Sequence, residues 1–140
     1  AMSKWQKLKH RIQLATEYRW FLSLEKDLSR MGMGDPSVVF DVGAHLGQTT
    51  LHFRKIFKNA HIHSFEPVAE NFQQLARNIG NRDRLFVNEM ALGSSVGTAF
   101  IDEGFSDLTY SISTASPSDK TEEVEEVVVE TIDRYMHREK

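Results

Sequence analysis

Two acidic residues and a glycine-bearing turn carry the chemistry that the sequence suggests. Asp41 lies in an apolar, mostly β-branched run, and Gly43 and Gly47 follow it where the chain must reverse. Glu66 ends a second apolar run and is followed by Pro67. Glycines at such a turn permit positive φ and close backbone approach, and a helix that starts behind it presents free N–H groups. We therefore predict a nucleotide-type cofactor site here.

The elements that must position these residues alternate between strands and helices. Apolar runs predict the strands, and apolar residues at helical spacing predict the helices between them. The predicted strands are 38–42, 62–66 and 85–90, and the predicted helices are 46–58 and 68–79. This order with short connections is typical of a parallel sheet with right-handed crossovers. The predicted fold class is therefore α/β, a Rossmann-like parallel sheet whose strands all end at one edge.

The rest of the chain is predicted to flank this unit. Residues 1–34 form an N-terminal helical extension, and residues 35–140 belong to the cofactor-binding domain. We interpret the basic, amphipathic helix over 4–31 as packed on the domain edge, with a membrane-surface or partner-binding helix as the alternative. Beyond the third strand we expect a turn at 91–93, a short strand at 96–101, a long surface loop over 102–123 that could cover the cleft, a strand at 124–131 and a helix at 132–138.

Composition excludes several classes of function. The 140 residues contain no cysteine, so thiolate catalysis, disulfides and Cys-based zinc sites are excluded. A net charge of −3 argues against general nucleic-acid binding. No apolar run approaches the roughly 18 residues of a membrane span, so we expect a cytoplasmic protein. His61 and His63 share one strand face, but no acidic partner stands at a helpful spacing, and we predict no metal site.

The turn itself discriminates between two classes of cofactor. Dinucleotide-binding domains use G-x-G-x-x-G, whose middle glycine lets the pyrophosphate touch the backbone. Here Ala44, His45 and Leu46 separate Gly43 from Gly47, so that glycine is missing and His45 adds bulk. A cofactor without phosphates fits better, and S-adenosylmethionine is one. Its cationic sulfonium and amino-acid end favour Asp41 close to the turn. NAD stays as the disfavoured alternative.

Successive strand ends supply further subsites in order. Glu66 can accept hydrogen bonds from both ribose hydroxyls, while Met90 and Ala91 lie at the end of the third strand, where an adenine would lie. Gln48 and Thr49 start the helix, and a cofactor contact through them is an open alternative.

These motifs resemble the FkbM-type methyltransferases. The resemblance covers about residues 38–135 and rests on F-D-V-G-A-H-L-G-Q-T, S-F-E-P, N-E-M-A-L-G and T-I-D. It implies S-adenosylmethionine-dependent methyl transfer, usually to a hydroxyl of a sugar, lipid or secondary metabolite. By position, it implies that Asp41, Gly43, Ala44 and Gly47 line the methionine end, Glu66 the ribose, and Met90 with Ala91 the adenine. His45 stands where the family often has Asn.

The family's pattern continues beyond the T-I-D element, so we expect this chain to be an N-terminal portion of such a domain. Three parallel strands would leave an apolar sheet edge exposed. We therefore predict either self-association, through that edge or the N-terminal helix, or coverage of the edge by the strand at 124–131. No residue stands out as a general base, and the catalytic residues stay unassigned. The non-enzymatic alternative is a nucleoside-binding or protein-interaction module.

Overall fold

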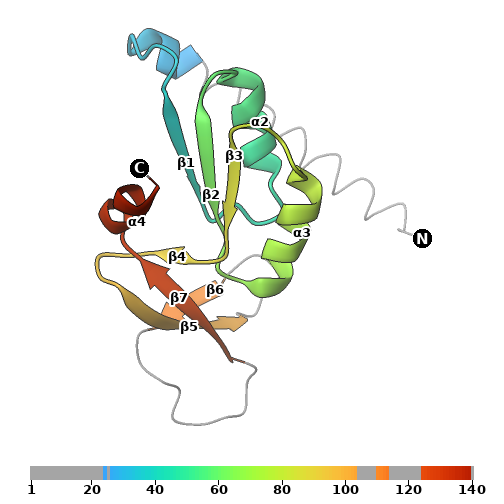
Figure 1. The fold of residues 1–140 in the computed structure, drawn as a ribbon, viewed down its shortest axis with the longest axis vertical. Helices are drawn as coiled ribbons and strands as arrows, with labels where there is room; N and C mark the ends of the chain where they lie inside the picture. The colour runs from blue at the N-terminus through green and yellow to red at the C-terminus, as the bar shows by residue number, and fades with distance from the viewer. Residues whose placement is uncertain (1–23, 25, 104–109, 114–123, 140) are drawn as a thin grey trace, which may run out of the picture.

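The computed structural model describes residues 24, 26–103, 110–113 and 124–139. Its centre is a parallel sheet in the order β1-β2-β3, formed by β1 (Val38–Val42), β2 (His61–Phe65) and β3 (Leu85–Asn88). The connecting helices α2 (Gln48–Ile56) and α3 (Ala69–Ile79) lie on the same side of this sheet (Figure 1). The predicted β-α-β-α-β unit is thus confirmed, and this α/β arrangement is compatible with a Rossmann-like fold.

Two apolar clusters join the helices to the sheet. In one, Leu75 and Ile79 of α3 pack with Ala44 of the turn, and all three are at most 3% exposed. In the other, Phe57 and Ala60 after α2 pack against Ile62 of β2, and the partly buried side chains of Val39 and Phe53 contact them. The helical spacing of apolar residues therefore correctly predicts which faces of α2 and α3 are buried.

The apolar, mostly β-branched sequence of β1 is typical of a strand covered on both faces, but the structure covers β1 only in part. Its one fully buried residue is Asp41, at 6% exposure, whereas Val42 is 58% exposed. Val38, Val39 and Phe40 are half-buried. Among the described residues β1 pairs with β2 alone, so its other edge has no partner strand there.

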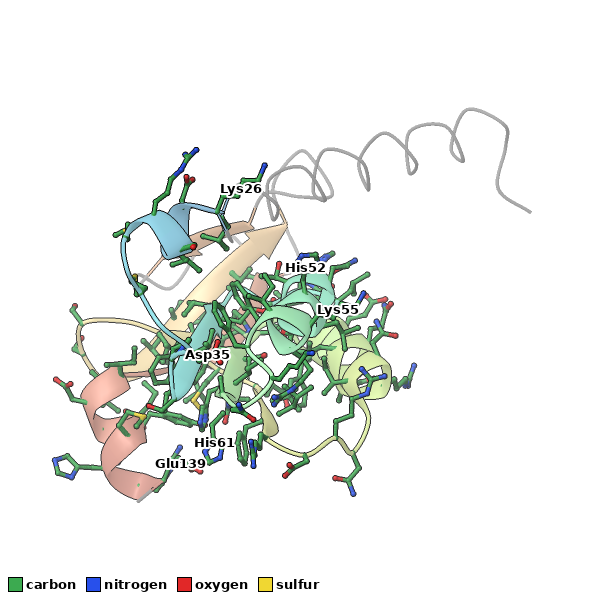
Figure 2. The ribbon with its side chains drawn as sticks, turned by 90° about the horizontal axis from the view of Figure 1, so that it is seen from above. Lys26, Asp35, His52, Lys55, His61 and Glu139 are labelled. Carbon is green, nitrogen blue, oxygen red and sulfur yellow. The ribbon has the colours of Figure 1, made fainter. Side chains whose placement is uncertain are left out.

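The face of the sheet opposite α2 and α3 carries an aromatic cluster. The helix α4 (Ile132–Arg138), predicted with these bounds, buries Tyr135 against Phe65, with ring centroids 4.9 Å apart. The Tyr135 hydroxyl lies 2.7 Å from Nδ1 of His63, and Phe86 stacks on the His63 ring. Figure 2 shows His61 and Glu139 on this side of the sheet, away from α2.

A second, mixed sheet departs from the predicted fold. Its order is β4-β7-β5-β6, formed by β4 (Ala91–Leu92), β7 (Val124–Glu130), β5 (Gly97–Glu103) and β6 (Tyr110–Ser113). Ala91–Leu92 is therefore a short strand rather than a turn, and the predicted loop over 102–123 contains the end of β5 and all of β6. The strand at 124–131 does not cover the edge of the parallel sheet, because it pairs with β4 and β5 instead. Antiparallel pairing with the nearby β5 satisfies its backbone groups locally.

Several predictions fall on residues outside the described ranges. Of the N-terminal helix, residues 24 and 26–30 are described and are helical, and the chain then turns at Gly32, whose φ is 66°. Most of the predicted helix over 4–31 and much of the predicted loop over 102–123 lie outside the described residues. Within the described residues, no helix is both long enough and apolar enough to cross a membrane.

Candidate functional site

The turn after β1 folds back onto the end of β2. The backbone amides of Gly43 and Ala44 both donate to the carbonyl oxygen of Phe65, at 2.9 and 3.0 Å. Gly43 adopts a φ of 77°, and a Cβ at this position would meet nothing within 4 Å. Open space beside a glycine backbone is what close approach of a ligand requires. The glycine predicted to line the cofactor therefore has room in front of it.

Glu66 connects three elements at this edge of the sheet. Its Oε2 accepts from the backbone N–H of His45 at 2.8 Å, and its Oε1 accepts from the N–H of Val68 at 3.1 Å. Its own backbone N–H donates to the carbonyl of Asn88 at the end of β3. Glu66 is only 5% exposed. The carboxylate therefore joins the turn after β1 to the beginning of α3, and it holds His45 at a φ of 50°, which is unusual for a non-glycine residue.

Gly47 is required for a different reason from Gly43. It precedes α2 with a φ of 90°, and an added Cβ would lie 2.8 Å from Cδ1 of Leu75 and 3.3 Å from Cδ1 of Ile79. The side-chain amide of Asn78 also donates to the carbonyl of Leu46 at 2.9 Å. The glycine thus lets the turn pack directly on α3, which fixes the distance between α2 and α3.

A buried polar network lies directly behind the turn. The Thr50 hydroxyl donates to Oδ2 of Asp41 at 2.6 Å, and the same hydroxyl lies 2.8 Å from the Ser64 hydroxyl. Asp41 and Ser64 are partners in the β1–β2 register, and Thr50 reaches them from α2. Burial raises the pKa of Asp41, and the hydrogen bond from Thr50 opposes that rise. Asp41 is therefore held by its neighbours at the end of β1.

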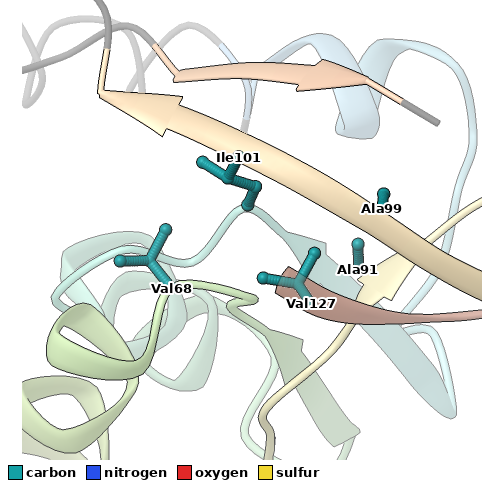
Figure 3. Close-up of a cluster of buried hydrophobic side chains, with 5 residues drawn as sticks. All are labelled: Val68, Ala91, Ala99, Ile101 and Val127. Atoms are coloured by element: carbon teal, nitrogen blue, oxygen red, sulfur yellow. The ribbon is translucent and has the colours of Figure 1, made fainter. Parts of the chain in front are cut away.

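The second sheet supports the Glu66 side of the site. Val68, just before α3, packs in a cluster with Ala91, Ala99, Ile101 and Val127 (Figure 3). Glu125 of β7 accepts from the first backbone amide of α3, that of Ala69, at 2.8 Å. Packing and capping together fix the segment that directly follows Glu66.

The predicted site residues divide into two groups. The structure brings together those at the carboxyl ends of β1 and β2: Asp41, Gly43, Ala44, His45, Gly47, Gln48, Thr49, Glu66 and Pro67. Gln48 and Thr49 are the first residues of α2, although neither is its N-cap. Met90 and Ala91 follow β3, and the side chain of Ala91 is buried in the second sheet's cluster. Met90 is half-buried.

Three polar contributors to the site were missed from the sequence. Thr50 lies at helical spacing from the apolar residues Leu46, Phe53 and Phe57, and was therefore assigned to the apolar face of that helix. Ser64 lies inside a predicted strand, and Glu125 belongs to an acidic segment. Buried polar groups need hydrogen-bond partners. A threonine or serine at a predicted buried position near an acidic residue is therefore the sequence signal from which Thr50 and Ser64 could have been predicted.

Two other features lie apart from this edge of the sheet. An apolar cavity of about 250 Å³ sits at the amino end of β1 and is lined by side chains such as Leu24, Leu28, Val39, Phe53 and Phe57. Such a lining has nothing with which to recognise a ribose or an amino-acid group.

Buried on the face toward α4, His63 engages Tyr135, and burial lowers the pKa of His63. Among the described residues, no group of three or more His, Asp and Glu side chains is placed to hold a metal ion.

Comparison with known proteins identifies one matching family. The model of the Methyltransferase FkbM domain matches residues 41–140, which include the whole turn, Glu66, the second sheet and α4. A search of curated proteins finds no match. Because the family model spans well over half of the chain, this protein belongs to the FkbM methyltransferase domain family.

Proposed function

We propose that this domain binds S-adenosylmethionine and transfers its methyl group to a hydroxyl of a small acceptor, a sugar, lipid or secondary metabolite. Membership in a methyltransferase family supports methyl transfer. One observation supports the choice of cofactor. Four backbone amides of the turn, those of Gly43, Ala44, His45 and Gly47, bond within the protein, and carboxylates, not cations, occupy the adjoining strand ends.

This arrangement disfavours a diphosphate. A dinucleotide-binding turn offers free N–H groups to the pyrophosphate. Here the amides of Gly43 and Ala44 bind a carbonyl, the amide of His45 binds Glu66, and the amide of Gly47 donates to the carbonyl of Ala44. The Glu66 carboxylate at the turn would also repel phosphate charge. A cationic ligand that carries hydroxyl donors suits the same groups.

The roles that we assign to individual residues follow from their hydrogen-bonding capacity. Each oxygen of Glu66 accepts one backbone amide, and a carboxylate oxygen has a second lone-pair site for a ribose hydroxyl. Asp41 would face the cationic amino-acid end, Gly43 would allow the ligand to approach the backbone, and Met90 with Ala91 would border the adenine.

When bound, S-adenosylmethionine supplies a methyl group on a positively charged sulfur for in-line displacement by the acceptor oxygen. The protein contributes mainly by aligning the reacting atoms. The buried carboxylates hold the cofactor end of that alignment. The acceptor side, including any general base, is not assigned to a residue.

Calorimetric titration of the 140-residue chain with S-adenosylhomocysteine, S-adenosylmethionine and NAD tests the proposal. We expect the first two ligands to bind and NAD not to bind, and NAD binding alone would refute the assignment. The 2′-deoxy analogue of S-adenosylhomocysteine leaves the protein untouched. It should bind about 10- to 100-fold more weakly, as expected for losing a hydrogen bond to a charged group. Equal affinity for the analogue would contradict the assignment of Glu66 to the ribose hydroxyls.

A matched pair of variants completes this experiment. Glu66→Gln replaces one acceptor oxygen by an amide that cannot accept from a backbone N–H, so both the turn and ligand binding should suffer. Glu70→Gln changes an exposed acid in the first turn of α3 and should bind as the unchanged protein does. Methyl transfer itself is read by mass spectrometry, as a gain of one methyl group on hydroxyl-bearing acceptors incubated with the cofactor.

A further inference from the structure

We propose that Thr50 and Ser64 are positioning residues of the cofactor site, forming a directed chain of hydroxyl hydrogen bonds that keeps Asp41 ionised and orients its carboxylate toward the cationic end of the ligand. This inference rests on the proposed function, because it assigns these two hydroxyls to the site that would bind S-adenosylmethionine.

The direction of the chain follows from counting protons. A threonine hydroxyl has one proton to donate, and that of Thr50 goes to Oδ2 of Asp41 at 2.6 Å. At the 2.8 Å contact Thr50 must then accept, so Ser64 is the donor. The 2.6 Å separation lies in the range of charge-assisted O–H···O⁻ bonds. An ionised Asp41 can only accept, so its ionised form requires the order Ser64 to Thr50 to Asp41.

Burial makes this support necessary. Asp41 is 6% exposed, whereas Thr50 and Ser64 are both 0% exposed, so water does not solvate the two hydroxyls. Burial disfavours the charged form of a carboxyl group and raises the pKa of Asp41, while the Thr50 hydrogen bond is the influence that lowers it. No charged group contributes to that shift. The titratable residues on the elements around Asp41 are His45 in the turn, His61 and His63 on β2, Glu66 after β2, and His52, Arg54 and Lys55 on α2.

The architecture also explains why both hydroxyls are needed. The register of β1 against β2 places Ser64 beside Asp41, and α2 brings Thr50 over both. Because Thr50 engages Oδ2, the proposal assigns Oδ1 to the ligand. Without Ser64, Thr50 would lack the neighbour that polarises its hydroxyl toward Asp41.

The decisive experiment is the pH dependence of S-adenosylhomocysteine binding, followed by calorimetry between about pH 4.5 and 7. The amino and carboxylate groups of the ligand keep their charges over this interval. Binding should weaken as Asp41 takes up a proton. In Thr50→Val the midpoint of that weakening should move up by about one to two pH units, as expected for losing a hydrogen bond to a charged group. Thr50→Ser should restore the original midpoint, and Ser64→Ala should give a smaller upward shift.

A second measurement separates this inference from the proposed function. Carbon-13 NMR of the Asp41 carboxyl group reports its titration without any ligand, and circular dichroism identifies variants that fail to fold. An unchanged Asp41 titration in folded Thr50→Val, or a shift in Thr50→Ser as large as in Thr50→Val, refutes the hydroxyl chain. If Asp41 titrates as expected but no S-adenosylhomocysteine binds at any pH, the proposed function fails, and the role of the chain at the cofactor fails with it.

Discussion

Gly47→Ala should destabilise the domain, because this glycine satisfies two requirements at once. Its φ of 90° lies in the left-handed region that residues with a Cβ adopt at a cost. The added carbon would also stand 2.8 Å from Cδ1 of Leu75 and 3.3 Å from Cδ1 of Ile79. Leu75 is 0% exposed and Ile79 is 1% exposed, so neither side chain can move without repacking the core.

The two contributions can be given separate magnitudes. The left-handed backbone costs about 1–2 kcal/mol for a residue with a Cβ, and overpacking a filled core costs about 1–3 kcal/mol. Together they predict a loss of about 2–5 kcal/mol in the free energy of unfolding. Gly43→Ala is the matched control, since its φ is 77° but its Cβ would meet nothing within 4 Å. It should show the backbone cost alone.

Urea denaturation followed by circular dichroism measures both losses. The difference between the variants should be about 1–3 kcal/mol, the part due to packing. In a Leu75→Val background, where Cδ1 is gone, Gly47→Ala should cost about 1 kcal/mol less, because contacting residues couple. Equal losses for Gly47→Ala and Gly43→Ala, with no coupling to Leu75→Val, would refute the argument that Gly47 is selected for contact with α3.

Four further predictions concern the elements around the site. Thr131→Ala should lower stability to urea by about 1 kcal/mol, because its hydroxyl caps α4, while Thr131→Ser should not. Burial lowers the pKa of His63 from 6.5, so the unfolded chain binds a proton before the folded chain does. Stability should therefore fall as the pH drops below 6.5, and a urea midpoint that does not change with pH in that range would contradict this. Burial raises the pKa of Tyr135 from 10.0, so the unfolded chain loses its proton first and stability should also fall as pH rises through that value. The same fall in Tyr135→Phe, which lacks the hydroxyl, would contradict this. Glu125→Ala should lower the free energy of unfolding by about 1 kcal/mol, because α3 loses a cap, and Glu126→Ala at an exposed position should leave it unchanged. Thermal denaturation of both variants measures the difference.

Turns and helix ends could be predicted from the sequence where the residues that determine them lie close together in the chain. The turn after β1 was predicted from Gly43 and Gly47, which both adopt positive φ. The end of α3 was predicted from Gly80, where the helix stops. The helix at 132–138 was predicted with the bounds of α4, which follows its N-cap Thr131. Backbone sterics and hydrophobic periodicity act over short distances, so a single sequence carries this information.

The second sheet could not be predicted from such local signals. Antiparallel pairing of β5 with β7 joins residues on either side of a long segment, as in the register of Ala99 with Val127. Periodicity predicts a strand but not its partner. The strand at 124–131 was therefore predicted correctly as an element, whereas the alternative that it covers the edge of the parallel sheet was wrong.

By itself, the sequence determined the family, the order of strands and helices around the cofactor turn, and the two acidic residues at the strand ends. Tertiary structure decided how those acids are held. Glu66 binds amides 21 residues before it and two residues after it, and Asp41 meets a threonine nine residues later that bonds a serine on the neighbouring strand. The physical reason is that buried polar groups find partners in space, through strand register and helix packing. Residue spacing alone therefore classed Thr50 with the apolar core, where its hydroxyl instead reaches Asp41.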